Sequence, residues 1–450
     1  MKRLIITITA LGAFFGGTAI AMSQNTNALT LDNAIKLAIE NNRSAKNARI
    51  EVEKQTDNLA AAKTHRLPTF KLDSLVSQPL STFDTHFDKG VFGTYPGIGP
   101  VPFEDTTITS STKPTAVTLL QIAQPLTQLK RIGLQIKQQE LQRQISQSEM
   151  RETQQAIVNN VKRAYYAILQ TQGQARAAEE SVKLYEELDR VTGEYVMQQV
   201  ALKTDQMDVQ TRLAKAQYQL MTITNQMTEQ KEQLNLLLGR DVNVTFTVAN
   251  EIETAQAMMR ETDLTEARQR ALAQRPEIRE ARLKMQQADL DRRAKKSEFI
   301  PDVSVTYNYV STFNQSDFMP RSVSGVGVQI EWEFFDWGRK KHEVAEKTRT
   351  VSQANNSLLD IQNQVVMEVN SRFRDLREAC ELIRIARLAQ TQARANVQLV
   401  AYKYKLDAVL LKDVLQAQTG LADANSDYQK ALLSFWTAKA DFEKALGEDK

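Results

Sequence analysis

The sequence predicts a mainly α fold with a membrane β-barrel portion. The chain is expected to be internally duplicated, with long coiled-coil helices that form an α-barrel and four β-strands that contribute to a trimeric, 12-stranded barrel. Two observations carry this prediction: the two halves of the chain repeat each other, and the apolar spacing changes from seven residues in helical segments to two in strand segments. Only 16 glycines and 10 prolines occur among 450 residues, which favours long helices over a loop-rich globule.

Residues 1–21 are expected to form a removed signal peptide. Lys2 and Arg3 precede an apolar run over residues 4–20, and Ala19-Ile20-Ala21 is a small-residue cleavage motif. No later stretch is apolar and long enough to cross a bilayer as a helix, so a membrane-embedded mature chain needs a β-barrel. The net charge of +3, without a basic tract, disfavours nucleic acid as a partner.

The duplication appears as identical residues at constant offsets. Early in each half the offset is 233 residues, as between Pro68 and Pro301, and later it is 208 residues, as between Asp205 and Asp413. The first half therefore carries 25 extra residues, in a segment rich in Gly, Pro, Thr and Phe that is typical of a long loop, Pro79 to Pro114. After the signal peptide, the predicted structural repeats are residues 22–241 and 242–450.

Each half is expected to run helix, strand, loop, strand, long helix, turn, helix. A seven-residue apolar repeat, clearest over residues 410–445, indicates coiled-coil packing of the helices. The long helices, 129–196 and 337–404, would each extend about 100 Å at 1.5 Å per residue. The shorter helices, 31–66 and 202–238 with their repeats, are about half as long, so two of them should stack end to end along one long helix.

The strands are recognised by alternation with a period of two. Apolar side chains alternate with Gly, Gln and Glu over residues 326–334, and with Ser, Thr and Asn over residues 303–309. Alternation over about ten residues is the length of a transmembrane β-strand, and segments 70–76 and 118–122 carry weaker versions. A water-soluble sandwich with one wet face is the alternative. Four strands cannot close a barrel in lipid, whereas three copies of the chain supply twelve.

Several motifs, in a fixed order and partly duplicated, carry a resemblance to a known family. The chain resembles the TolC-type outer-membrane efflux proteins over nearly all of its mature length, from Leu29 to Gly447. The motifs are Leu31-Asp32-Asn33-Ala34-Ile35 with its repeat Leu264-Thr265-Glu266-Ala267, Pro68 and Pro301 at the helix-to-strand junctions, Phe334-Phe335-Asp336-Trp337-Gly338-Arg339, and Asp413 to Ala422 with Ala445-Leu446-Gly447 at the end.

The resemblance implies a homotrimer in the outer membrane of a Gram-negative bacterium that extends into the periplasm. Its periplasmic tips would close the tunnel and dock a membrane-fusion adaptor, which links the channel to an inner-membrane transporter. The implied function is a passive channel of a tripartite efflux pump that carries drugs or other small molecules. Two alternatives stay open: the outer-membrane duct of a type I protein-secretion system, and a periplasmic coiled-coil scaffold or adaptor.

The resemblance also implies a gate at the second helical tip. Asp413 and Tyr404 match the acidic ring and the tyrosine of the family by spacing. Asp205 and Asp407 could add negative charge near the constriction, where three-fold symmetry would focus the electrostatic field. The alternative is that these aspartates are solvated or cap helix N-termini. Where the family has a second acid and two turn glycines, this sequence has Gln416, Gln199 and Asp407.

Two further groups are candidate contact surfaces. Apolar residues beside the tip turns are candidates for adaptor docking, unless they only begin the heptad seam: Val200, Ala201, Leu202 and Leu410. Aromatic residues in and after the second-half strands are candidates for a girdle facing outer-membrane lipid, although a soluble core would use such residues too. These aromatic residues are Tyr307, Tyr309, Trp332, Phe334 and Trp337.

No feature of the sequence predicts catalysis. The chain has no phosphate-binding loop, no H-E-x-x-H motif and no G-x-S-x-G motif. The single cysteine, Cys380, excludes an intrachain disulfide framework and a cysteine metal cluster. The three histidines are isolated in the sequence. We therefore expect a protein that is not an enzyme and that needs neither a cofactor nor a bound metal.

Overall fold

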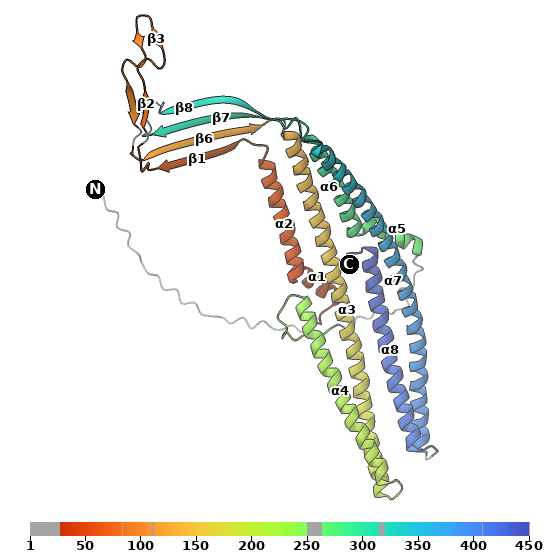
Figure 1. Ribbon diagram of the computed structural model, residues 1–450. Helices are drawn as coiled ribbons and strands as arrows, with labels where there is room; N and C mark the ends of the chain where they lie inside the picture. Colours follow the sequence, from red (N-terminus) through yellow and green to blue (C-terminus); the bar gives the residue numbers. More distant parts are fainter. Residues whose placement is uncertain are drawn as a thin grey trace, which may run out of the picture.

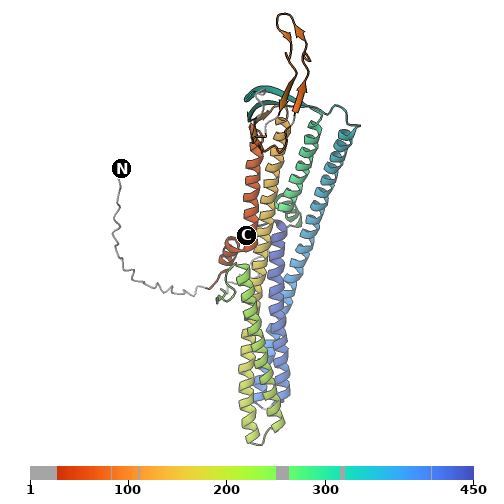
Figure 2. The same cartoon turned by 60° about the vertical axis from the view of Figure 1, so that its left-hand side comes forward.

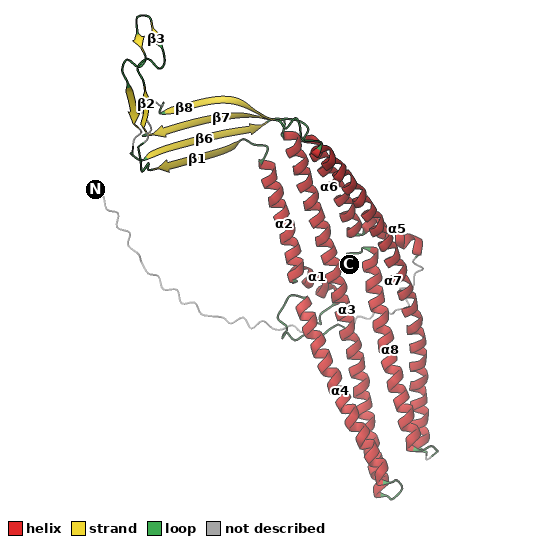
Figure 3. Cartoon of the chain, viewed as in Figure 1, coloured by secondary structure: helices red, strands yellow, loops and turns green. Residues whose placement is uncertain are grey.

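The computed structural model describes residues 28–82, 84–109, 112–249, 263–314, 320–406 and 408–449. The helices form an elongated body, and a β-sheet lies beyond one end of it (Figures 1 and 3). The predicted signal peptide and Asp407 lie outside the described residues. In the described part of the chain, no helix has an apolar stretch of the length required to cross a membrane.

The elements of each half follow the predicted order. The first half contains α1 (Leu31–Asn41), α2 (Arg43–Thr64), β1 (Thr69–Ser77), β6 (Thr115–Pro125), α3 (Leu129–Met197) and α4 (Lys203–Leu237). The second half contains α5 (Leu264–Gln274), α6 (Pro276–Ser297), β7 (Asp302–Phe313), β8 (Ser322–Glu331), α7 (Arg339–Lys405) and α8 (Leu411–Leu446). Four short strands lie between β1 and β6: β2 (Asp84–Phe87), β3 (Thr94–Tyr95), β4 (Gly99–Pro100) and β5 (Thr106–Thr109).

The four long strands form one antiparallel sheet in the order β1-β6-β7-β8. The two halves of the chain therefore meet in the sheet through β6 and β7, and β1 and β8 form its edges. The alternation over residues 326–334 predicted a strand that reaches Phe334. β8 instead ends at Glu331, because its partner β7 begins at Asp302, directly opposite Glu331. Trp332 and Phe334 consequently lie in the linker before α7.

The single helix predicted over residues 31–66 is two helices, broken at Asn42. The side-chain oxygen of Asn42 accepts hydrogen bonds from the N–H groups two and three residues on, which begins α2. Its amide nitrogen donates to the carbonyl of Leu237 at the end of α4, over 2.9 Å. The second half has the same break at Arg275, between α5 and α6. A seven-residue pattern does not reveal such breaks, because apolar residues continue on both sides.

The short helices stack end to end along the long ones, as predicted. α2 packs on the sheet end of α3, where Leu59 contacts Ile132 and Ile136. α4 packs on the far half of α3, where Val209 contacts Tyr185. Figures 1 and 2 show α2 and α4 in line along the length of α3. In the second half, α6 and α8 follow α7 in the same way.

The segment predicted as a long loop, Pro79 to Pro114, contains paired strands instead. β2 pairs with β5, and β3 pairs with β4, so the chain extends away from the sheet as a ribbon (Figure 2). Its glycines suggested a loop because they supply turns: Gly90, Gly93 and Gly97 all have positive φ. The threonine-rich flanks of the segment form the ladder. The prediction of a long loop was therefore wrong in that the segment contains two pairs of strands.

Candidate functional site

The sheet has one apolar face and one polar face. Side chains alternate between the two faces along each strand. One row across the four strands consists of Phe70, Ile122, Tyr307 and Val326, and the next row, on the other face, consists of Lys71, Gln121, Asn308 and Gly325. In the single chain the apolar row is uncovered at both edges, since Phe70 is 71% exposed and Val326 is 76% exposed. Such a pair of faces suits lipid on one side and water on the other.

Exposed aromatic side chains lie between the sheet and the helices. Trp332, Phe334 and Trp337 are 58%, 82% and 89% exposed. Tyr307 and Tyr309 lie farther along, inside β7 and on the apolar face. The five aromatic candidates therefore occupy two levels, two in the strand and three in the linker. Their role as a girdle at the bilayer interface stays a prediction.

Both helical tips are built around an aspartate in the first turn of the returning helix. The carboxylate of Asp205 accepts a hydrogen bond from the backbone N–H of Leu202, over 3.3 Å. The carboxylate of Asp413 accepts one from the N–H of Leu410, over 3.1 Å. Each aspartate is thus the third residue of its helix and satisfies the N–H of the N-cap leucine, so the prediction that the aspartates are themselves N-caps was wrong in position. A role in a gate stays a prediction for both, and for Asp407.

The first tip keeps a left-handed backbone without a glycine. Gln199, at the position where the family has glycine, has φ of 60°. This conformation costs a non-glycine residue about 1 kcal/mol. Closing contacts offset it, because the N–H of Val200 donates to the carbonyl of Tyr195 over 2.9 Å. The turn therefore has a left-handed conformation that glycine favours, although the position is occupied by glutamine.

The docking candidates and the gate tyrosine differ in burial. Of the four docking candidates, Val200, Leu202 and Leu410 are 71%, 69% and 62% exposed, whereas Ala201 is half-buried. Tyr404 is also half-buried, and its ring centroid lies 6.4 Å from that of Tyr195. The contact joins the end of α7 to the end of α3. The structure therefore brings the two tips of one chain together through tyrosine side chains.

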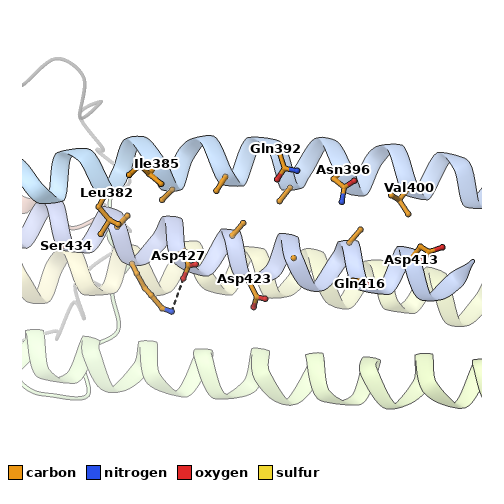
Figure 4. A pocket seen from close by; sticks show the side chains of 18 residues that line it. Leu382, Ile385, Gln392, Asn396, Val400, Asp413, Gln416, Asp423, Asp427 and Ser434 are labelled. Carbon is orange, nitrogen blue, oxygen red and sulfur yellow. Dashed lines mark hydrogen bonds and ion pairs between the residues drawn. The ribbon is translucent and has the colours of Figure 1, made fainter. Parts of the chain in front are cut away.

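A groove of about 950 Å³ runs between α7 and α8 from the second tip toward the middle of the molecule. Asp413 lines its tip end, and Asp423 and Asp427 line its continuation (Figure 4). The α7 wall is mostly apolar or small, with Ile385 and Ala389 among its residues. Asp427 pairs with Lys430 at 3.5 Å. The remaining carboxylates give the groove a negative character.

Part of this region was not predicted from the sequence. Asp423 and Asp427, which line the groove with Asp413, were not predicted. Their helical spacing from Asp413 on α8 was the signal that could have found them. Met197 and Leu406, which are 79% and 60% exposed at the tips, were also missed. Both stand outside the heptad seam beside a turn, where an apolar side chain has no partner in its own helix pair. An apolar residue out of register at a tip is the pattern to look for.

The chain matches a known protein family over most of its length. The family model described as outer membrane efflux protein matches residues 34–240 and 267–448, which together make up most of the chain. The chain belongs to the outer membrane efflux protein family. The protein is therefore an efflux channel component of the outer membrane. None of the curated proteins compared with the sequence matches it.

Solved structures of outer-membrane channels share this fold. CmeC of Campylobacter jejuni is 14% identical with a TM-score of 0.72, over 99% of this chain and 94% of that one. The open state of MtrE of Neisseria gonorrhoeae is 16% identical with a TM-score of 0.70, over 93% and 89%. CusC is 16% identical with a TM-score of 0.75, over 93% and 92%. The two matched segments of the family model fall in the two predicted repeats, whose boundaries stay a prediction.

Proposed function

We propose that the protein is the passive outer-membrane channel of a tripartite efflux pump and that three copies of the chain build it. One observation carries the proposal: the sheet has an apolar face and two edge strands, β1 and β8, without a partner in the described chain. Unpaired backbone groups are too costly in lipid, so β1 of one copy is expected to pair with β8 of the next. Three copies supply twelve strands, a number within the range of membrane barrels.

The helices offer a second surface for a neighbouring copy. In each chain α3 contacts α8, while α4 and α7 lie on the two flanks of this pair. Both flanking helices expose large apolar side chains. On α4, Tyr218 and Met221 are 68% and 54% exposed, and on α7, Met367 and Leu388 are 66% and 69% exposed. We expect α7 of one copy to cover α4 of the next, because burial of such residues stabilises association.

The tips are the proposed contact with a periplasmic adaptor, which would join the channel to an inner-membrane transporter. Exposed apolar residues at both tips support this assignment: Val200, Leu202 and Leu410, with Ala201 beside them. We propose that the gate contains Asp413 and Tyr404, with Asp205 and Asp407 nearby. Three copies would place each carboxylate around one axis, where a narrow lumen strengthens its field.

The assembly is tested by purification from outer-membrane fractions. We expect an unheated sample to migrate as a trimer of the chain without its signal peptide and to open channels in planar bilayers. Heating should convert the trimer to the monomer. Recovery of the protein as a soluble periplasmic monomer would exclude a channel and favour a scaffold or adaptor.

The cargo is tested in a strain from which the gene is deleted. We expect the deletion strain to accumulate more ethidium and similar small cationic dyes, and a plasmid copy to reverse the change. Unaltered dye accumulation, together with loss of a secreted protein from the medium, would instead assign the channel to a type I secretion system. Co-purification of an inner-membrane transporter with the channel identifies the pump directly.

A further inference from the structure

The sheet end of the helical layer has a groove lined by apolar residues and by charged residues of both signs. It lies between α3, α6 and α7 and has a volume of about 540 Å³. Its apolar lining includes Leu141 and Leu290, and its charged lining residues are Lys137, Arg293, Glu140 and Asp289. Lys137, Glu140 and Arg293 therefore share one face of the helical layer.

Ion pairs identify which face this is. Arg131 of α3 pairs with Asp302 at 2.8 Å, and Asp302 belongs to the polar face of the sheet. Lys295 of α6 pairs with Glu343, and Arg339 links Glu343 to Glu333 in the linker after β8. The helix face with Arg131 and Lys295 therefore continues the polar face of the sheet. The groove lies on the other face, because Arg293 is two residues from Lys295 and points to the opposite side of α6.

The acids at this groove are already paired. Glu140 accepts a hydrogen bond from Arg143 over 2.6 Å, and Asp289 pairs with Arg292 at 2.7 Å. The hydrogen bond from Arg143 lowers the pKa of Glu140, and the nearby charge of Lys63 lowers it further. Each of the two carboxylates therefore already has a cationic partner on its own helix. Among the described residues, neither acid forms an ion pair with Lys63 or Arg293.

Four cations near the strands form what we call the basic collar: Lys63, Lys130, Arg293 and Lys296. All four are exposed, and the structure gives none of them a hydrogen bond or ion pair with a described residue. Lys63 acts on Glu140 at the groove, and Lys296 lies one turn after Arg293. Lys130 lies two turns before the groove residue Lys137. The collar therefore lies on the face that continues the apolar side of the sheet.

The level of the collar matches a bilayer surface. Lys63 and Lys296 occupy the last turns of α2 and α6, at equivalent positions of the two repeats. Exposed apolar residues follow each of them before the strands begin: Leu67 is 60% exposed and Phe299 is 50% exposed. A cation followed within a turn by an exposed apolar side chain is the arrangement that anchors proteins at a membrane interface.

We propose that the basic collar binds the headgroups of anionic glycerophospholipids in the periplasmic leaflet of the outer membrane. The phosphate groups lie against Lys63, Lys130 and Lys296, and the acyl chains run upward along the apolar face of the sheet. Charge complementarity and continuity with the apolar face both support this occupant. The inference rests on the proposed trimeric barrel, in which three collars form one ring around the outside.

Native mass spectrometry of the full-length trimer tests the inference. The trimer in detergent is titrated with phosphatidylglycerol or with phosphatidylcholine, and the apparent Kd for the first bound lipids is compared. Each lysine near an anionic surface is worth about fivefold in affinity, so the triple variant Lys63→Gln/Lys130→Gln/Lys296→Gln should bind phosphatidylglycerol about 100-fold more weakly. The matched control, Lys36→Gln/Lys46→Gln/Lys215→Gln, removes three exposed lysines far from the sheet and should bind like the wild type.

The outcomes separate this inference from the proposed function. A spectrum without trimers contradicts the proposed function, whereas trimers with equal affinity for the two lipids contradict the collar alone. Displacement of phosphatidylglycerol by an equal concentration of inorganic phosphate would also overturn it, because the site would then bind anions rather than lipid. The single variant Lys296→Arg keeps the charge and the fold, and it should retain wild-type affinity.

Discussion

The contact between Gly239 and the break of the first helix offers a sharp test of how the short helices stack. Gly239 ends α4 with φ of +69°, and a Cβ at this position would lie 2.4 Å from the carbonyl oxygen of Asn41. Gly447 ends α8 in the same way, but there the nearest backbone atoms lie at 3.2 Å, around Arg275. The two glycines occupy equivalent positions in the two repeats, but the neighbouring backbone lies closer to Gly239 than to Gly447.

The expected destabilisation follows from two contributions. A left-handed backbone costs alanine about 1 kcal/mol, and forcing a methyl group against fixed backbone atoms costs about 2 kcal/mol more. Gly239→Ala should therefore lower the free energy of unfolding by about 3 kcal/mol. Gly447→Ala should lower it by about half as much, because the atoms around it need to move only a few tenths of an ångström.

Thermal unfolding followed by circular dichroism at 222 nm measures the effect on the purified protein at one scan rate. At about 2–4 °C per kcal/mol, Gly239→Ala should lower the Tm by about 6–12 °C. Gly420→Ala is the control, since no atom lies within 4 Å of its added Cβ and alanine favours the helix. An unchanged Tm for Gly239→Ala would show that α4 does not end against the break between α1 and α2.

Three other predictions concern the sheet, the tip and the lone cysteine. Val328→Arg on the apolar face should destabilise barrel assembly by a few kcal/mol and so reduce the trimer yield, whereas Gln329→Arg on the polar face should not; a normal trimer yield for Val328→Arg would mean that the faces are reversed or do not contact lipid. Asp413→Ala should raise single-channel conductance in planar bilayers and weaken block by cations, and unchanged values would remove this residue from the gate. Partial burial, with the charge of Glu381, raises the pKa of the Cys380 thiol. Less thiolate is then present at pH 8, so alkylation should be slower than in the urea-unfolded protein and should speed up as the pH rises; equal rates would contradict the shift.

The sequence predicted the order of elements because each signal was strong and repeated. A seven-residue apolar spacing over 410–445 leaves only coiled-coil packing, and α8 buries Val414, Phe435 and Phe442 from that series. Strand alternation likewise placed β7 and β8. The breaks at Asn42 and Arg275 escaped detection because they depend on contacts with the ends of α4 and α8, more than 160 residues away.

The candidate site was less predictable than the fold. The capping role of Asp205 and Asp413 follows from local spacing, since each carboxylate reaches back three residues. The contact between Tyr195 and Tyr404 joins helices from different repeats, and nothing in either local sequence indicates it. Residues that act across the two helix pairs therefore required the structure, whereas residues that act within one turn did not.

The two repeats also show how duplication preserves a position while its chemistry changes. Asn42 in the first half donates to the carbonyl of Leu237, and its equivalent Arg275 donates to the carbonyl of Ala445, so both side chains close the same junction. Asn42 is neutral, but Arg275 carries a charge and is only 7% exposed. A buried charge requires partners, and Arg275 has Glu277 at 2.7 Å and Glu368 of α7 at 2.9 Å.

Arg275 therefore connects three helices, α6, α7 and α8, whereas Asn42 connects α2 with α4. Arg275 begins α6, contacts the end of α8 through Ala445 and pairs with α7 through Glu368. Loss of Glu368 would leave one carboxylate, Glu277, to balance the buried guanidinium, so Glu368→Gln should destabilise the second half more than any neutral change at Asn42 destabilises the first. The two junctions thus share a terminal glycine and a hydrogen bond from a side chain to a helix-end carbonyl, but they differ in the side chain that makes it.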